Sequence, residues 1–451
     1  MRLPVSTTSP KTQTAARSYR IGLLGSYGSN NLGDTSVQKS VMQNLRRWIP
    51  GASFFGFAWS AADVARTHRI PSIIALGEGP FVIPQSSGPD IQAPIPHSRW
   101  VRAFLAVLPA MVRRTIIIGL VTYQLDALFI SGSAQIDDYW GGAFVQPWRL
   151  MIWSLWSKLH GIPVVVMGVG FGELHTRMGK TLAVNALRLT DFRFFRDPGT
   201  VTCLQKLGFH EPSVLGPDPA FGLVFRPEPP AYNHRPFVVI NPIARQAWPG
   251  DEDEDYRHYL DCLAALGSHF LERGVEVHFA CSQILMDPPI VEEVLRRMPP
   301  ENARHCEVVA IQSVEDYCRA TAHADLVIST RLHGLILAAV AGTPIFAIAN
   351  TRKVRQLMVD LDMSSQYRDI HALRRDDLMT AVNSAYENRL ALKSALAAKI
   401  NGYRAALEAI NAAVVSELAR HPLRLKADWL GLPGGMPAPI PSVTALAPLS
   451  V

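Results

Sequence analysis

The sequence predicts an α/β protein with two halves, each built on a parallel β-sheet. Short apolar runs alternate along the chain with segments that carry apolar residues at helical spacing, a pattern typical of βαβ units. A proline-rich stretch at residues 225–236 divides this pattern into two halves of similar size. The runs expected to form strands are residues 20–24, 127–131, 164–168, 238–240, 275–280, 326–329 and 345–349.

Composition sets the limits of the two domains. We expect the first domain over residues 19–228 and the second over residues 236–420, which finishes with Ala- and Leu-rich helix. Residues 1–18 are rich in Ser and Thr and lack periodicity, which predicts a flexible N-terminal tail. Residues 421–451 are rich in Pro, Gly and Ala and predict a second flexible tail.

Length and residue usage exclude several classes of protein. The 451 residues, of which 48% are hydrophobic, suffice for two or three packed domains and are too apolar for a disordered chain. No apolar run reaches the ~18 residues of a membrane-spanning helix, and the first residues lack the apolar segment of a signal peptide. We therefore expect a cytoplasmic protein. The five cysteines show no CxxC spacing, which predicts reduced core residues rather than disulfides or a zinc site.

The chain carries a net charge of +6. Nucleic acid would explain this charge, but no nucleic-acid-binding module or aromatic–basic repeat accompanies it, so we expect no nucleic-acid partner. An anionic substrate, an anionic membrane surface and scattered surface arginines explain it equally well.

Residues 329–334, Ser-Thr-Arg-Leu-His-Gly, are the most informative segment of the sequence. An apolar run precedes them and a helical segment at residues 335–341 follows, so Arg331 and His333 lie on a strand-to-helix turn. Ligands of open α/β sheets bind at such turns, and the backbone N–H groups of a helix start favour an anion. His333 is suited to carry a proton near neutral pH, although a histidine at a helix start also bonds locally.

A glycine-rich segment, residues 25–34, follows the first predicted strand directly. Thr35 and Gln38 have the spacing of a capping box, which predicts a helix that starts at Thr35 and leaves Asp34 outside it, facing a cleft. Asp34 is equally suited to be the helix N-cap itself. The glycines let the backbone approach a ligand closely but match neither the GxGxxG nor the P-loop pattern.

Other strand ends also carry glycines or charged residues. Residues 131–133 and 168–172 are glycine turns that suit one shared ligand crevice, although each alone is typical of a tight βα turn. Arg196, beside Asp197, is suited either to hold a carboxylate in a bidentate manner or to form an ordinary surface ion pair.

In this order, the motifs resemble those of the polysaccharide pyruvyltransferase family. The resemblance spans about residues 20–360 and rests on residues 28–34, 130–133, 168–172, 196–197, 217–220 and 329–334, with Thr343, Pro344 and Lys353 beyond. It implies two Rossmann-like domains that face each other across a cleft, as in GT-B glycosyltransferases. It also implies transfer of the enolpyruvyl moiety of phosphoenolpyruvate onto two sugar hydroxyls as a cyclic ketal, in surface polysaccharide biosynthesis.

The resemblance also assigns residues to the site. By motif position, Arg331 and His333 are donor-site residues and Arg196 is a second donor contact, while Asp34 and Lys353 fall on further motif positions. We hypothesise that His333 serves the donor and Asp34 the acceptor, as the catalytic pair. The other expected binding residues are Leu332, Gly28, Asn31, Gly33, Gly132, Ser133 and Gly170.

The sequence departs from the family at two places. Ser131-Gly132-Ser133 stands where the family usually has three glycines, and we expect this difference to alter the ligand crevice. The stretch between Asp34 and Asp126 is longer than usual and predicts an added surface element.

Several alternatives remain open at this point. The acidic run at residues 251–255 suggests a metal, but it precedes a helical segment, where the helix dipole favours acidic residues. We expect no resident cofactor or metal ligand set, and a divalent metal is not excluded. The acceptor is a lipid-linked or nucleotide-linked sugar. The rival functions are a sugar-nucleotide-dependent glycosyltransferase and an inactive scaffold subunit of a polysaccharide assembly complex.

Residues 97–114 combine apolar residues at helical spacing with four arginines. Such a basic amphipathic stretch with Trp suits a peripheral contact at the inner face of a membrane. An ordinary helix that packs on the sheet gives the same pattern.

Overall fold

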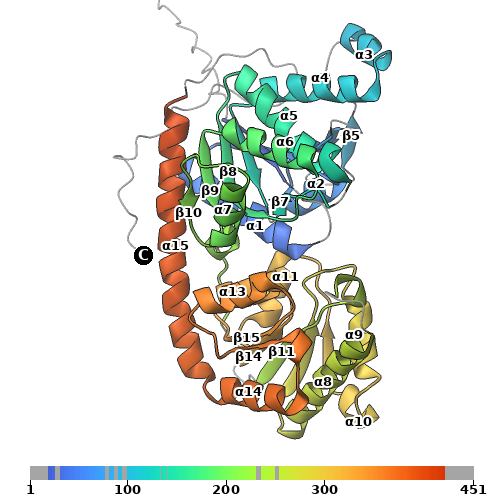
Figure 1. The fold of residues 1–451 in the computed structure, drawn as a ribbon. Helices are drawn as coiled ribbons and strands as arrows, with labels where there is room; N and C mark the ends of the chain where they lie inside the picture. Colours follow the sequence, from blue (N-terminus) through green and yellow to red (C-terminus); the bar gives the residue numbers. More distant parts are fainter. Residues whose placement is uncertain are drawn as a thin grey trace, which may run out of the picture.

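The protein folds into two α/β domains stacked end to end (Figure 1). The computed structural model describes residues 19–25, 31–76, 81–85, 90–93, 99–132, 134–139, 141–229, 235–248 and 253–421. The predicted N-terminal tail, residues 1–18, lies outside this part of the chain. So does the predicted C-terminal tail, residues 421–451, apart from its first residue. Gly28 and Ser133 also lie outside it.

The first domain holds a largely parallel sheet in the order β10-β9-β8-β6-β1-β2-β3-β4-β5, with β7 beside β8. Its strands are β1 (Arg20–Leu24), β2 (Ser53–Ala58), β3 (Ser72–Ile74), β4 (Phe81–Ile83), β5 (Ile91–Ala93), β6 (Ala127–Ser131), β7 (Ala134–Ile136), β8 (Val164–Phe171), β9 (Phe192–Phe195) and β10 (Val214–Leu215). Among these strands, β4 pairs antiparallel with both β3 and β5, and the other pairs are parallel. The strands β4 and β5 therefore make the antiparallel end of the sheet. They belong to the stretch between Asp34 and Asp126, where the sequence predicted an added element.

The second domain holds a parallel sheet in the order β13-β12-β11-β14-β15-β16. Its strands are β11 (Phe237–Asn241), β12 (Glu276–Ala280), β13 (Cys306–Val309), β14 (Leu326–Ser329), β15 (Ile345–Ala349) and β16 (Tyr367–Asp369). Numbered within the domain, this is the 3-2-1-4-5-6 order of the Rossmann fold, and the first domain contains the same order. The predicted fold class, two Rossmann-like domains in a GT-B-like arrangement, is confirmed.

Helices cover both faces of the two sheets (Figure 1). In the first domain they are α1 (Leu32–Trp48), α2 (Ala61–His68), α3 (Arg99–Ala106), α4 (Ala110–Tyr123), α5 (Gln146–Leu159), α6 (Arg177–Arg188) and α7 (Pro198–Lys206). In the second they are α8 (Asp253–Glu272), α9 (Pro288–Leu295), α10 (Pro300–Ala303), α11 (Val314–Thr321), α12 (Leu332–Val340), α13 (Arg352–Asp360), α14 (Arg375–Glu387) and α15 (Arg389–Ala419). None of these helices is long and apolar enough to cross a membrane.

Alternation along the strands explains why both faces need helices. In β14, Leu326 and Ile328 enter the core beneath α8 and α14, whereas Val327 between them enters the core shared with α11 and α12. Strands buried on both faces read as continuous apolar runs, and for this reason the sequence pattern predicts β14 and β15 to the residue. Most strands that it does not predict have two to four residues, too few to show a pattern.

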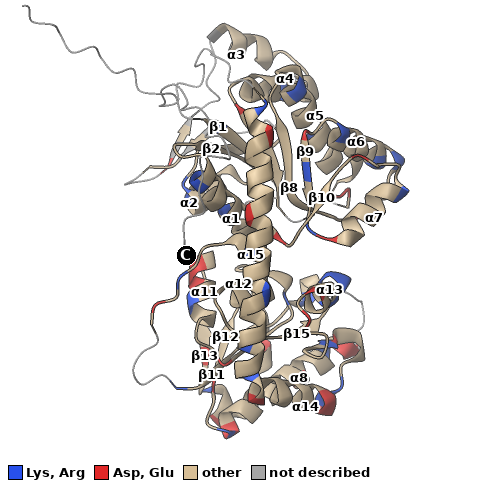
Figure 2. Cartoon of the chain, turned by 90° about the vertical axis from the view of Figure 1, so that its left-hand side faces the viewer, with Lys and Arg blue, Asp and Glu red and all other residues tan. Residues whose placement is uncertain are grey.

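The last helix joins the domains. We expected residues 376–420 within the second domain, but α15 runs along both domains (Figure 2). Its first half packs Leu396 and Ile400 into the core, and Lys399 pairs with Asp362 of the second domain. Near its middle, Tyr403 packs edge-on against Phe221 of the first domain, and Leu407 and Ile410 of its second half enter the same core. One apolar core therefore contains residues of both domains and of α15, which holds their relative position.

Candidate functional site

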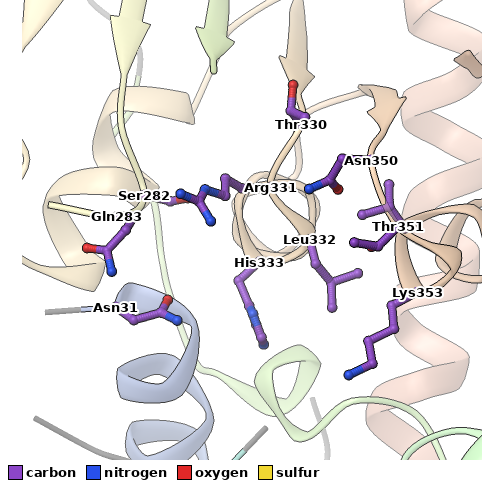
Figure 3. A pocket seen from close by; sticks show the side chains of 11 residues that line it. Asn31, Ser282, Gln283, Thr330, Arg331, Leu332, His333, Asn350, Thr351 and Lys353 are labelled. Atoms are coloured by element: carbon purple, nitrogen blue, oxygen red, sulfur yellow. The ribbon is translucent and has the colours of Figure 1, made fainter. Parts of the chain in front are cut away.

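A cavity of about 170 Å³ lies where the second sheet meets the first domain. It opens beyond the carboxyl end of β14, next to the switch point between β11 and β14, where ligands of open α/β sheets bind. Its described lining is Asn31, Ser282, Gln283, Thr330, Arg331, Leu332, His333, Asn350, Thr351, Lys353 and Val354. Figure 3 shows His333 and Lys353 pointing to the same side, toward the first domain.

Three helices begin at this cavity. Asn31, Arg331 and Thr351 are the N-caps of α1, α12 and α13, and all three line it. The Asn31 side chain accepts from the Gly33 amide at 2.9 Å, whereas no side chain caps α12 or α13. Each helix start presents amide donors and the positive end of a dipole. The described lining also includes the cations Arg331 and Lys353 and no carboxylate, so the cavity is suited to an anion.

Hydrogen bonds within the second domain fix the turn that carries Arg331 and His333. The Thr330 amide donates to the Asn241 carbonyl at 3.0 Å, and Ser329 Oγ accepts from the Arg331 amide at 3.1 Å. Gly334 is required here, because a Cβ at this position would lie 2.1 Å from the Asn241 side-chain nitrogen. The helix starts at Leu332 rather than at the predicted residue 335, so His333 lies in its first turn.

Arg331 forms a bidentate ion pair with Asp287. Its Nε donates to one carboxylate oxygen at 2.8 Å and its Nη2 to the other, and the Asp287 side chain is fully buried. Asp287 also accepts from the Ala244 amide at 3.1 Å. The pair fixes the guanidinium plane at the edge of the cavity and leaves other guanidinium donors for a ligand.

His333 contacts the first domain closely. A Cβ at Gly33 would lie 2.3 Å from Nδ1 of His333, so the backbone of α1 lies directly against the imidazole. The approach of α1 is fixed nearby, because the Leu32 amide donates to the Ser282 carbonyl at 3.2 Å and Asn31 forms a β-bridge with Gln283. Two motifs that lie three hundred residues apart in sequence therefore meet, and the glycine is what permits the contact.

A buried ion cluster lies on the other side of His333. Its Nε2 is 3.7 Å from the Asp218 carboxylate, which accepts from Arg196 at 2.5 Å. Burial alone would raise the pKa of Asp218, but Arg196 and His333 beside it hold that pKa well below its usual value. Asp218 is thus an ionised carboxylate that lies between Arg196 and His333. Arg196 pairs with Asp218 rather than Asp197, which instead caps α7, so the surface-pair alternative is wrong.

Lys353 interacts electrostatically with two further predicted site residues, Arg196 and Asp34. It lies in the first turn of α13, keeps its side chain accessible to solvent and lines the cavity. Desolvation by the surrounding walls lowers its pKa, and the charge of Arg196 lowers it further, while Asp197, Asp137 and Asp34 act in the opposite direction. Lys353, Arg196 and Asp34 therefore share one electrostatic environment across the two domains.

Both sequence-based placements of Asp34 are wrong. Asn31 is the N-cap of α1, so Asp34 lies inside the first helical turn, with 7% of its surface exposed. The capping box at Thr35 and Gln38 does not form, because the helix has already begun at Leu32. Among the residues that the structure describes, Asp34 and Arg196 lie beyond the lining of the cavity itself.

The predicted glycine turns lie apart from the described lining. Gly132 directly follows β6 and has a φ of 112°. The turn expected at residues 168–172 is wrong: β8 continues to Phe171, and Gly170 pairs with Ala134 of β7. Gly168, at a φ of 66°, lies at a register shift in the pairing of β8 with β9. A Cβ at this position would lie 2.0 Å from Pro219, so the close approach requires glycine.

Sequence reasoning missed several residues of the site. Asp287 follows β12 in a loop with no motif, and Asp218 was quoted only as part of a family segment. Ser282, Gln283, Asn350 and Thr351 lie just after predicted strands, and the rule that ligands bind at strand carboxyl ends was the signal that would have found them.

The acidic run at residues 251–255 is described only from Asp253 onward, where α8 begins. Within the described residues no three His, Cys, Asp or Glu side chains are grouped as metal binding requires. All five cysteines are free, and Cys262, Cys281 and Cys318 are buried, as predicted for core thiols, whereas Cys203 and Cys306 are only partly buried.

Solved structures similar to this chain share its two-domain architecture. A putative UDP-N-acetylglucosamine 2-epimerase from Listeria monocytogenes has a TM-score of 0.56 at 11% identity, over 91% of this chain and 100% of that chain. The UDP-GlcNAc 2-epimerase from Neisseria meningitidis bound to UDP-GlcNAc has a TM-score of 0.55 at 9% identity, over 89% and 100%. At such identities the likeness concerns the fold alone. No curated protein matches the sequence.

The sequence itself matches a family model, that of polysaccharide pyruvyl transferases, over residues 43–352. The match contains Arg196, Asp218, Arg331 and His333 and ends one residue before Lys353, while the first turn of α1 precedes it. Since it covers more than half of the chain, the protein belongs to the polysaccharide pyruvyl transferase family.

Proposed function

We propose that this protein transfers the enolpyruvyl moiety of phosphoenolpyruvate onto two hydroxyls of a sugar as a cyclic ketal, in surface polysaccharide biosynthesis. The observation that carries the proposal is the cavity at which three helices begin, with two cations and no carboxylate in its described lining. Phosphoenolpyruvate presents a phosphate and a carboxylate, and two groups of donors suit these two anions.

The donor groups divide naturally between the two anions. The amides at the start of α12 and the guanidinium of Arg331 form one group. The amides at the start of α13 and the ammonium of Lys353 form the other. Arg331 is held in plane by Asp287 and suits a planar carboxylate, while Lys353 suits a phosphate as a point charge.

Ketal formation needs one proton on the methylene carbon of the donor. His333 donates this proton, the carbon–carbon double bond becomes a methyl group, and positive charge develops at the neighbouring carbon. One sugar hydroxyl attacks that carbon, phosphate leaves, and the second hydroxyl closes the ring. The two hydroxyl protons are recovered on the methyl group and on phosphate, so the reaction is balanced. The ionised carboxylate of Asp218 lies 3.7 Å from Nε2 and places a negative charge next to the imidazole.

Asp34 is the proposed base for the acceptor. It approaches from the first domain, in the first turn of α1 and next to the glycine that contacts His333. A carboxylate there accepts the hydroxyl proton while His333 acts on the donor. The acceptor is a lipid-linked or nucleotide-linked sugar and the reaction takes place in the cytoplasm. No resident cofactor enters this scheme.

The proposal is tested by incubating the protein with phosphoenolpyruvate and a panel of lipid-linked and nucleotide-linked sugars. We expect phosphate release and, by mass spectrometry, a sugar that carries one pyruvyl ketal. Stabilisation against heat by UDP- or GDP-sugars but not by phosphoenolpyruvate would instead favour a glycosyltransferase. No phosphate release with any acceptor, despite binding of the donor, would favour a scaffold subunit.

A further inference from the structure

The helices α3 and α4 form a corner on the side of the first domain away from the second (Figure 1). The inward side of this corner packs on the sheet, because Leu105, Ile117, Ile118 and Val121 are buried in the core of the first domain. The packing alternative considered for residues 97–114 therefore accounts for the inward side. It leaves the outward side unexplained.

The outward side of the α3–α4 corner (residues 99–114) is apolar and exposed. Trp100 is 85% exposed and Phe104 58%, and their spacing of four residues places them on one face of α3, while Val107, 79% exposed, follows in the turn after the helix. Met111 and Val112, in the first turn of α4, are exposed as well. Five large apolar side chains on adjacent turns form a patch of the kind that marks an interaction surface.

The charge around this patch identifies its partner. Residues 91–125 contain four arginines, Arg99, Arg102, Arg113 and Arg114, and no Asp or Glu. This segment supplies four of the six net positive charges of the chain. An apolar face with Trp and Phe, in a segment whose sequence is basic and contains no Asp or Glu, complements the surface of an anionic bilayer, with its acyl boundary below phosphate headgroups.

We propose that the α3–α4 corner docks the protein onto an anionic lipid bilayer. Trp100, Phe104 and Val107 enter the boundary between headgroups and acyl chains, and Arg113 and Arg114 of α4 stay at the level of the lipid phosphates. The corner lies away from the cavity, so docking leaves the site between the domains accessible. The proposal is independent of the reaction proposed above.

Sedimentation of the full-length protein with vesicles tests this proposal. We expect binding to vesicles of phosphatidylcholine and phosphatidylglycerol at about three to one, and little binding to phosphatidylcholine alone. At 1 M salt, where the Debye length is about 3 Å, binding to the mixed vesicles weakens. Brominated acyl chains quench tryptophan fluorescence of the bound protein, and Trp100→Phe reduces this quenching.

The double variant Trp100→Ser, Phe104→Ser is expected to bind mixed vesicles at least about tenfold more weakly, because it removes two aromatic side chains from the boundary. Its thermal unfolding stays that of the wild type, since both side chains are exposed. The matched control is Leu390→Ser, at a residue 74% exposed on α15, and it leaves binding unchanged. Absence of binding, or equal binding by the double variant, would overturn the proposal. So would a concentration-dependent dimer that the double variant abolishes, which would make a second copy the partner.

Discussion

Gly33 of the first domain lies directly against the imidazole of His333 in the second domain. A Cβ at position 33 would be 2.3 Å from Nδ1, well inside van der Waals contact, so either the imidazole or the helix must move to accept one. The relative position of the two domains and the orientation of the proposed proton donor are therefore set by the same contact.

Gly33→Ala is expected to lower kcat by about 100-fold, because a displacement of the order of 1 Å at a reacting group has that effect. Alanine itself favours the helix but the added Cβ overpacks the contact, so thermal unfolding of the variant is measured to separate lost activity from lost folding. The matched control is Gly402→Ala in α15, where nothing lies within 4 Å of an added Cβ. That variant keeps wild-type activity and is slightly more stable. Equal activity of the two variants would show that the contact with His333 has no role.

The Asp218 carboxylate contributes stability that depends on pH. Its pKa is lower in the folded protein than the value of about 3.9 in an unfolded chain, so its contribution is complete above about pH 5 and is lost as the pH falls toward the folded value. Asp218→Asn leaves Arg196 buried without its carboxylate, a change that costs about 3–5 kcal/mol.

Denaturant unfolding of wild type and Asp218→Asn at pH 7 and at about pH 3.5 measures this dependence. The difference in unfolding free energy is expected to be smaller at the acid pH. A difference that grows on acidification would contradict the ionised state of Asp218.

Arg331 and Asp287 are expected to be energetically coupled. Each single variant, Arg331→Gln or Asp287→Asn, leaves one partner of the buried pair alone and destabilises the protein by about 3–5 kcal/mol. The destabilisation of the double variant is expected to be smaller than the sum of the two single destabilisations, and the difference, which is the coupling energy, is about 1–3 kcal/mol. The exposed pair Arg47–Glu408 serves as control, with a coupling below about 1 kcal/mol. Additivity at Arg331 and Asp287 would contradict the bidentate contact.

The lowered pKa of Lys353 predicts that donor binding depends on pH. Its pKa lies below the usual value for lysine, so it loses its charge at a lower pH than an ordinary lysine does. The KM for phosphoenolpyruvate should therefore rise as the pH increases, and the rise should begin at a lower pH than the titration of an ordinary lysine would give. Lys353→Arg keeps the charge and moves this rise to higher pH, whereas Lys353→Ala raises KM at every pH. A KM that is the same for all three proteins at pH 7–10 would exclude Lys353 from the donor site.

Sequence patterns predicted those parts of the fold that depend on local periodicity. The strands β1, β6, β14 and β15 are buried on both faces, and their apolar runs show them to the residue. The start of α1 was wrong because Asn31 caps it and the Leu32 amide bonds to Ser282, in the other domain. No local pattern contains such a partner.

In the candidate site too, residues marked by local sequence patterns were predicted, and residues whose role depends on tertiary contacts were missed. Arg331, His333 and Lys353 were predicted because strand-to-helix turns and family motifs mark them, and the structure brings them to one cavity. Asp287 was missed because its role comes from a bidentate contact over 44 residues, in a loop without periodicity. The turn at residues 168–172 was wrong because the strand pairs with β7 there, which depends on tertiary structure.

Phosphate release from saturating phosphoenolpyruvate, in the presence of an accepted sugar, tests the central claim most directly when wild type is compared with His333→Ala and His305→Ala. His305 is an exposed histidine and serves as the matched control. Loss of a positioned proton donor should lower the turnover of His333→Ala by about 10²–10⁴-fold while His305→Ala stays at the wild-type rate. A His333→Ala enzyme with near-normal turnover would contradict the assignment of His333 as the group that moves the proton.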